Sequence, residues 1–205
     1  MIYRDTHNSL RALSAVAGHQ AGYFTAKQAS GVGYGYSHLS YHLHVGNFVR
    51  AGHGIYRMSL SGYAEHDDLV RLALWSRDRH DRPQAVVSHA TALFLHQLSD
   101  VLPRRVHLTV PPSFRKQPPG ECILHKAWIE ERDIDRREGF SVTTPLRTLL
   151  DAAEDVTLAD EQLRRAVKDS LQRGLIRMAA LSNGTLARPA ASRLRKILAS
   201  IERAT

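Results

Sequence analysis

Glycines divide the first sixty residues of the chain into short segments, and their spacing limits which elements can form there. The glycines that matter are Gly18, Gly31, Gly33, Gly46, Gly52 and Gly54. Apolar residues recur at helical spacing before Gly18, so we expect a first helix that ends at this glycine. After a short extended piece, Thr25 and Gln28 fit a capping box and predict a second helix that ends near Gly31 or Gly33.

The next stretch predicts a third helix followed by a hairpin. Ser37 is expected as the N-cap of this helix and Gly46 as its C-terminal glycine. Leu39 and Leu43 define its buried stripe. The side chains expected to point away from the core are Ser37, His38, Tyr41 and His44, with Ser40 and His42 on the flanks. Two short apolar runs around the tetrapeptide 51–54 indicate a hairpin. This order of elements is that of a winged helix-turn-helix, whose third helix enters the major groove of DNA.

The rest of the chain predicts a second domain that mixes helices and strands. We expect helices over 67–79, 89–98 and 145–153 and strands over 106–110 and 122–125. Residues 141–143 lead into the helix over 145–153, which Thr144 is expected to cap. From residue 158 the pattern is wholly helical, with helices over 158–172 and 191–203 and a turn at 178–181. The predicted fold class is therefore α+β. A winged helix-turn-helix over 1–62 precedes an α+β domain over 63–205 that ends in basic helices.

Positive charge gathers at the two ends of the chain. The protein carries 28 Lys and Arg against 20 Asp and Glu, a net charge of +8. Residues 1–65 hold five basic and two acidic side chains, 66–155 hold thirteen and fourteen, and 156–205 hold ten and four. This pattern indicates polyanion binding at the ends, with solubility alone as the alternative. The side chains expected to contact polyanions without sequence preference are Arg193, Arg195, Lys196 and Arg203.

The sequence lacks the residues and motifs that disulfide-rich, zinc-binding, secreted, membrane and enzymatic proteins require. A single cysteine, Cys122, excludes an internal disulfide framework and a four-cysteine zinc site. The start of the chain lacks the apolar run of a signal peptide, and no stretch approaches the length of a membrane span. No phosphate-binding glycine loop or nucleophile elbow is present, and the acids at 130–135 alternate with arginines. We therefore expect a soluble, cytoplasmic protein that is not an enzyme, needs no cofactor or metal and has no membrane partner.

Blocks of the sequence resemble a known family. The segments 36–43, 46–50 and 54–57 are similar to the N-terminal winged helix of AbiEi-type antitoxins, which belong to type IV toxin–antitoxin systems. The segments 88–93, 106–111 and 142–151 look like the blocks of that family's second domain. The most specific block reads Thr-Thr-Pro-Leu-Arg-Thr-Leu-Leu-Asp. The resemblance covers roughly residues 8–175 in the order that the family shows.

The resemblance implies a DNA-binding repressor of its own operon. Such antitoxins usually accompany a nucleotidyltransferase-like toxin, which they counter without necessarily forming a tight complex. The first domain would bind inverted repeats in double-stranded DNA near the promoter, and the second would contribute to antitoxicity. This chain departs from the family in one place. No Lys, Arg, Asp or Glu lies between Lys27 and Arg50, whereas relatives often carry Arg or Lys on the third helix.

Several side chains are candidates for DNA contact. Hydroxyl groups can donate to phosphates and base edges, and histidine titrates near pH 6.5, so it can replace fixed positive charge. The candidates are Lys27, Ser37, His38, Tyr41, His42, His44, Arg50, His53 and Arg57. Packing of Tyr41 against the wing and solvation of the surface histidines are the alternatives. His38 and His42 lie four residues apart, but no carboxylate or cysteine nearby completes a metal site.

The second domain has fewer candidates. Thr143, Thr144 and Arg147 are expected to line the surface that carries antitoxicity. Arg147 and Asp151 lie four apart on one helix, where a structural ion pair is favoured over a catalytic remnant. Cys122 has no obvious nucleophilic partner and is expected to be inert. The alternative to a DNA-binding antitoxin is a protein-interaction antitoxin with weak or no specific DNA binding.

Overall fold

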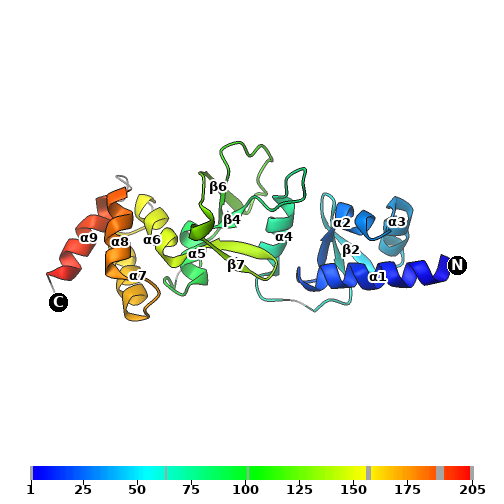
Figure 1. Ribbon diagram of the computed structural model, residues 1–205, viewed down its shortest axis with the longest axis horizontal. Helices are drawn as coiled ribbons and strands as arrows, with labels where there is room; N and C mark the ends of the chain where they lie inside the picture. Colours follow the sequence, from blue (N-terminus) through cyan, green and yellow to red (C-terminus); the bar gives the residue numbers. More distant parts are fainter. Residues whose placement is uncertain (1, 63, 101, 156–157, 188–191, 204–205) are drawn as a thin grey trace. The chain divides into compact units, whose positions relative to one another are not determined.

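The computed structural model describes residues 2–62, 64–100, 102–155, 158–187 and 192–203. The chain folds into two compact units. The first comprises Met1–Ala85 and Arg137–Phe140, and the second comprises Val86–Arg136 and Ser141–Thr205. Figure 1 shows that helices and strands occur in both units, so the predicted α+β class is confirmed.

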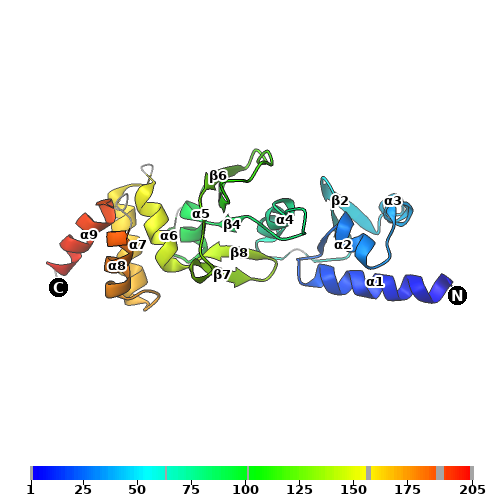
Figure 2. The ribbon, with the colours of Figure 1, turned by 45° about the horizontal axis from the view of Figure 1, so that its top comes forward.

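The first unit contains a helix-rich segment and a small sheet. Its elements are α1 (Ile2–Gly18), β1 (Tyr23–Thr25), α2 (Ala26–Gly31), α3 (Tyr36–His44), β2 (Phe48–Gly52), β3 (Ile55–Met58) and α4 (Asp67–Trp75). The strands pair antiparallel in the order β1-β3-β2. In Figures 1 and 2, α1 runs along one side of α2 and this sheet. The predicted order of helix, strand, two helices and hairpin is thus present.

Aromatic rings fill the core of the first unit. Phe24 is fully buried, with its ring centroid 5.0 Å from Phe48 and 5.7 Å from Tyr56. Leu13 of α1 and Leu39 of α3 close the same core from the helical side. Because each element is short, the sheet and the three helices depend on this shared cluster for stability.

Local signals fixed several of these elements. Thr25 accepts a hydrogen bond from the backbone N–H of Gln28 at 3.1 Å, and the backbone N–H of Thr25 donates to the Gln28 side chain at 2.9 Å. The predicted capping box is therefore confirmed. The predicted domain boundary at residue 62 falls inside the first unit, because α4 packs against β1 and β3.

The second unit is built on a five-stranded sheet. Its strands are β4 (Val86–Val87), β5 (Val106–Val110), β6 (Cys122–Lys126), β7 (Ile134–Arg137) and β8 (Phe140–Thr143), in the order β6-β5-β4-β8-β7. β5 pairs parallel with β6 and antiparallel with β4, and β4 pairs parallel with β8. The turn between β7 and β8, Arg137–Phe140, belongs to the first unit, because it packs mainly against residues of that unit.

Helices complete the second unit. They are α5 (His89–Leu95), α6 (Pro145–Glu154), α7 (Asp160–Gln172), α8 (Met178–Ala187) and α9 (Ser192–Glu202), with a short 3-10 turn at Glu131–Asp133. Leu149, Leu163, Leu181 and Leu194, one from each of the last four helices, are fully buried in one apolar cluster. Every described helix is too short or too polar to cross a bilayer.

Some predicted bounds differ from the structure. The helix expected over 67–79 ends at Trp75, where the Ser76 hydroxyl accepts the backbone N–H groups of Gln84 and Ala85 at 3.0 Å and ties the returning chain to the helix end. The turn expected at 178–181 is a helix that continues to Ala187. β4 and β7 are not predicted, because β4 has two residues and β7 carries mostly charged ones. Residues 141–143, expected only to lead into the next helix, belong to strand β8.

Candidate nucleic-acid interface

Two residues set the turn between α2 and α3. Gly33 has φ +94°, and a Cβ there would lie 2.9 Å from the Ser9 hydroxyl oxygen, so the position requires glycine. Tyr34 is only 2% exposed, and its ring centroid lies 6.0 Å from those of His38 and Phe48. The buried tyrosine therefore holds the start of α3 against the sheet.

The N-cap of α3 is Gly35 and not Ser37 as predicted. Gly35 has extended backbone, and its carbonyl accepts the N–H of Leu39 at 3.1 Å. The helix begins one residue before Ser37 because burial of Tyr34 fixes where the chain turns. Ser37 thus lies in the first turn, where its hydroxyl faces solvent.

The exposed side of α3 is uncharged and rich in hydroxyl groups. We name it the reading face, and it consists of Tyr36, Ser37, Ser40, Tyr41 and His44. Tyr36 is 87% exposed and Tyr41 62% exposed. His38 is also exposed, so the predicted orientation of Ser37, His38, Tyr41 and His44 is confirmed. Tyr36 and Ser40 are not among the predicted contacts, although Tyr36, Ser40 and His44 follow one another at intervals of four residues and therefore share one side of the helix.

His42 differs from the prediction of a DNA contact. Its ring stacks on Phe48 at 4.8 Å, and its Nδ1 lies 2.9 Å from the Asn47 side-chain nitrogen. Because an amide nitrogen can only donate, Nδ1 accepts and the ring is neutral. Burial lowers the pKa of His42, and the neighbouring His38 lowers it further. His42 therefore joins α3 to β2 and does not supply charge.

The hairpin presents two of the predicted contacts. Arg50 on β2 is exposed, with its Nε 3.5 Å from the Gly52 carbonyl, and a bulge interrupts the register between Arg50 and Gly52. His53 is exposed in the turn, and Gly54 beside it has φ +67°. Lys27 on α2 instead donates from Nζ to the backbone carbonyl of Arg79 at 2.9 Å, although it remains exposed.

Arg57 is held inside the first unit and is not the open phosphate contact that the sequence predicted. Its guanidinium donates to the Gly62 carbonyl at 2.7 Å and lies 3.8 Å from the Asp67 carboxylate. It also lies over the ring of Tyr23, 5.4 Å from the centroid. The side chain is only 14% exposed. A contact to Asp67 on α4 accounts for the difference, because that helix was assigned to the other domain.

The predicted antitoxicity residues are mostly buried. Thr143 is fully buried, and its hydroxyl lies 2.7 Å from that of Thr148. Thr144 caps α6 by accepting the backbone N–H of Arg147. Arg147 is 9% exposed and pairs with Asp151 at 2.8 Å, as predicted. Thr143 and Arg147 therefore order the second unit from within and do not line an open surface.

The basic residues near the end of the chain differ in whether the fold already uses their side chains. Arg193 donates to the Asp160 carboxylate and to the backbone carbonyls of Asp155 and Leu158. It is thus committed to the fold of α7 and α9. Arg195, Lys196 and Arg203 are exposed. Contact with polyanions stays a prediction for these exposed side chains and is unfavourable for Arg193.

The described residues show no arrangement of three His, Cys, Asp or Glu side chains that could hold a metal ion. Cys122 on β6 is only 1% exposed. Its burial explains why the thiol is expected to be unreactive.

Comparison with known proteins bears on the first unit. Residues 11–59 match the family described as "Transcriptional regulator, AbiEi antitoxin". This match begins within α1 and ends just after β3, and it confirms the resemblance for the N-terminal segments. No curated protein matches the chain. The crystal structure of the RV2827C protein from Mycobacterium tuberculosis is similar over 93% of this chain and 80% of that one, at 16% identity and a TM-score of 0.49.

Proposed function

We propose that this chain, which carries an AbiEi-type antitoxin regulator segment, binds double-stranded operator DNA and represses its own toxin–antitoxin operon. In this proposal α3 enters the major groove and the β2–β3 hairpin follows the phosphate backbone. The observation that carries the proposal is the reading face, which is exposed on the third helix of a segment that matches a family of transcriptional regulators.

The chemistry of the reading face suits neutral contacts. The hydroxyls of Ser37, Ser40 and Tyr41 can both donate and accept, so they can contact base edges or phosphate oxygens without an ionised group. Cations then come from the hairpin, where Arg50 and His53 are exposed. We therefore expect α3 to contribute sequence preference and the hairpin to contribute affinity that falls with salt.

The second unit is proposed to contribute to antitoxicity against a nucleotidyltransferase-like toxin. The support is the resemblance of its blocks to the family's second domain. A direct complex with the toxin is not required by this proposal. Co-expression of the toxin encoded beside it, with either the whole chain or residues 86–205, tests whether growth is restored by the second unit.

Operator binding is tested by fluorescence anisotropy with the full chain. A labelled duplex from the region upstream of the gene is compared with a scrambled duplex of equal length and composition. We expect tighter binding to the upstream duplex, and a loss of about tenfold, roughly 1.4 kcal/mol, for Tyr41→Ala. Trp128→Ala is the matched control, because Trp128 is a similarly exposed aromatic residue in the second unit, at 73%.

The second candidate is a protein-interaction antitoxin. It is favoured by apolar exposure beside the reading face, where Val45 is 45% exposed and Val49 is 55% exposed. Equal affinity for the upstream and scrambled duplexes, with Tyr41→Ala unchanged, would reject the repressor and support this alternative. The toxin, added to the labelled full chain, would then raise the anisotropy in its place.

A further inference from the structure

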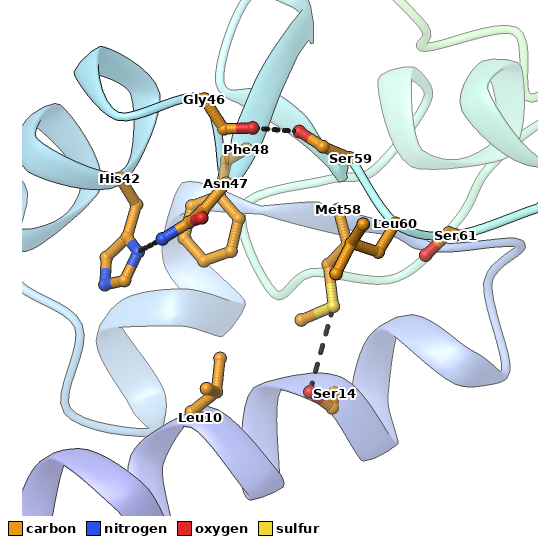
Figure 3. A pocket seen from close by; sticks show the side chains of 10 residues that line it. All are labelled: Leu10, Ser14, His42, Gly46, Asn47, Phe48, Met58, Ser59, Leu60 and Ser61. Carbon is orange, nitrogen blue, oxygen red and sulfur yellow. Dashed lines mark hydrogen bonds between the residues drawn. The ribbon is translucent and has the colours of Figure 1, made fainter.

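A pocket of about 460 Å³ lies in the first unit, and it is lined by His42 but not by the exposed Tyr41. Figure 3 shows that three segments enclose it: α1 with Leu10 and Ser14, the turn from α3 into β2, and the chain from Met58 to Ser61. Its size is within the range of pockets that bind small molecules. The cavity is not part of the reading face.

The walls of the pocket are apolar and polarisable. Leu10, Phe48 and Met58 supply apolar surface, and the Met58 sulfur lies 3.8 Å from the Ser14 hydroxyl. Leu60 at the rim is fully exposed, so its side chain gains contacts if a ligand occupies the pocket. Thioether sulfur and aromatic rings both pack favourably on a flat aromatic ligand.

The lining excludes a charged ligand. The described residues that line the pocket include no Lys, Arg, Asp or Glu, and His42, the one titratable group among them, is neutral because its Nδ1 accepts from Asn47. An ionised ligand would lose hydration without gaining a partner of opposite charge. Hydroxyl and amide groups of Ser14, Asn47 and Ser61 offer hydrogen bonds to one or two polar atoms.

The pocket shares its lining with the segment that holds α3. The backbone N–H of Asn47 donates to the His42 carbonyl at 2.9 Å, and that of Ser59 donates to the Asn47 carbonyl at 3.0 Å. The Ser59 hydroxyl also donates to the Gly46 carbonyl. A ligand against Asn47 and Ser59 therefore contacts the residues that connect the end of α3 to the end of the hairpin.

We propose that this pocket binds a small, neutral, flat aromatic molecule with one or two hydrogen-bonding atoms and that occupancy changes the affinity for DNA. Coupling arises if the ligand binds one arrangement of the α3–β2 turn better than another. The binding step is independent of the proposed function. The coupling step rests on it, so the two are measured separately.

Binding is tested first, without DNA, by amide chemical shifts of the labelled full chain titrated with indole. We expect saturable shifts at Asn47, Ser59 and Leu60 with a dissociation constant of about 1 mM or tighter. Indole-3-acetate, which adds a carboxylate to the same rings, should bind at least about tenfold more weakly. Absence of saturable shifts with indole, or equal binding of the two probes, overturns the proposal.

Variants locate the probe. Ser14→Phe fills the pocket from α1 and should abolish the shifts, whereas Ala15→Phe changes an exposed neighbour that does not line the pocket and should leave them intact. If Ser14→Phe fails to fold by circular dichroism, Leu60→Ser takes its place, because a fully exposed side chain contributes little to folding. Leu60→Ser should weaken indole several-fold, and Leu102→Ser, at a 69% exposed leucine of the second unit, should not.

Two further outcomes are decisive. Shifts at the same amides that depend on protein concentration without indole would show a second copy in the pocket and overturn the small-molecule proposal. Saturating indole should change the dissociation constant for the upstream duplex at least about threefold in the wild-type protein and not in Ser14→Phe. An unchanged DNA affinity rejects the coupling, while absence of any specific DNA binding rejects the proposed function and leaves the indole result standing.

Discussion

The histidines of α3 and those of the second sheet show how packing decides what the same side chain can do. On α3, His38 and His44 are exposed and only His42 is packed, against Phe48. In the second unit, three imidazoles lie against one another from three elements. They are His89 at the start of α5, His107 on β5 and His125 on β6. The exposed pair is available to a ligand, whereas the packed trio belongs to the fold.

The geometry of the trio explains its electrostatics. The His89 and His125 rings stack at 3.5 Å with planes 12° apart, and His107 Nδ1 lies 3.0 Å from His125 Nε2. Burial lowers the pKa of all three, and that of His89 falls to about 4. Asp155 opposes each of these shifts but does not outweigh burial. Composition does not distinguish among the twelve histidines of the chain. Packing leaves His38 and His44 exposed on α3 and partly buries the trio in the second unit.

The largest predicted effect concerns a buried ion pair in the second unit. Arg147→Met should lower the free energy of unfolding by about 3–5 kcal/mol, because the carboxylate of Asp151, 3% exposed, loses the guanidinium that it pairs with. Burial alone lowers the pKa of Arg147, but Asp151 and Asp133 outweigh it and hold the guanidinium charged. Hydrogen exchange at the amides of α6 measures the loss.

The matched control is a surface pair in the same unit. Arg136 lies 2.6 Å from Glu131, and both side chains are more than 70% exposed. Arg136→Met should change stability by less than about 1 kcal/mol. Equal protection of α6 in both variants would contradict the assignment of Arg147 as a buried structural cation.

The second prediction is that acid destabilises the second unit more than the first. Because the folded pKa of His89 lies below 6.5, the unfolded chain binds more protons between pH 6.5 and about 4, and stability falls as the pH falls through that window. His89 alone accounts for a loss on the order of 3 kcal/mol. His107 and His125 act in the same direction.

Hydrogen exchange at pH 7 and pH 5 separates the units. Amides of β5 and β6 should lose protection on acidification more than those of β3, where no such cluster lies among the described residues. His89→Gln should reduce the difference, and His38→Gln should not. Equal loss in both sheets would mean that the trio does not control the acid response.

Sequence could predict the elements whose cause is local. The capping of α2 by Thr25 and of α6 by Thr144 depends on residues three positions apart, and both are confirmed. The strand at 106–110 and the Leu39 stripe follow from short periodic patterns. Each of these signals lies within one element, so no tertiary information was needed.

The candidate site is harder to predict, because contacts with residues distant in the sequence decide which of its side chains are available to DNA. His42 was assigned to DNA, but Asn47 and Phe48 bind it after the chain turns. Arg57 was assigned to phosphate, but Asp67 on α4 attracts it. The histidine trio joins residues up to 36 positions apart and has no sequence pattern. Spacing identifies exposed positions on a helix but not which polar groups are already paired.

The third prediction compares exposed and committed cations near the end of the chain. Replacing Lys196 and Arg203, both exposed, by Gln should reduce the magnitude of the log–log salt slope of DNA binding by up to about 1.8, since each phosphate contact contributes about 0.9. Arg193→Gln should instead loosen α9, because that guanidinium bridges to Asp160. The salt slope is measured on the scrambled duplex. An unchanged slope in the double variant would assign these side chains to another partner.

The smallest predicted effect is the pH dependence of operator affinity. Protonated imidazole attracts phosphate, and a phosphate beside it favours the protonated form, so binding takes up protons and the complex tightens on acidification. Affinity should therefore rise a few-fold between pH 7.5 and 6. The pair His38→Gln and His44→Gln should remove most of this rise. His42→Gln should not, because burial lowers the pKa of His42 and its ring stacks on Phe48.

Operator affinity can be measured over most of the range from pH 7.5 to 6 with the second unit stable, since its stability falls mainly as the pH falls below 6.5. Far-ultraviolet circular dichroism at each pH therefore accompanies the anisotropy. A flat affinity in the wild-type protein with the fold intact would show that His38 and His44 are spectators. Contact would then consist of neutral hydrogen bonds from Ser37 and Tyr41, with Arg50 supplying the charge on the hairpin. A rise that persists in the double variant but is lost in His53→Gln would move the titrating contact from α3 to the hairpin turn.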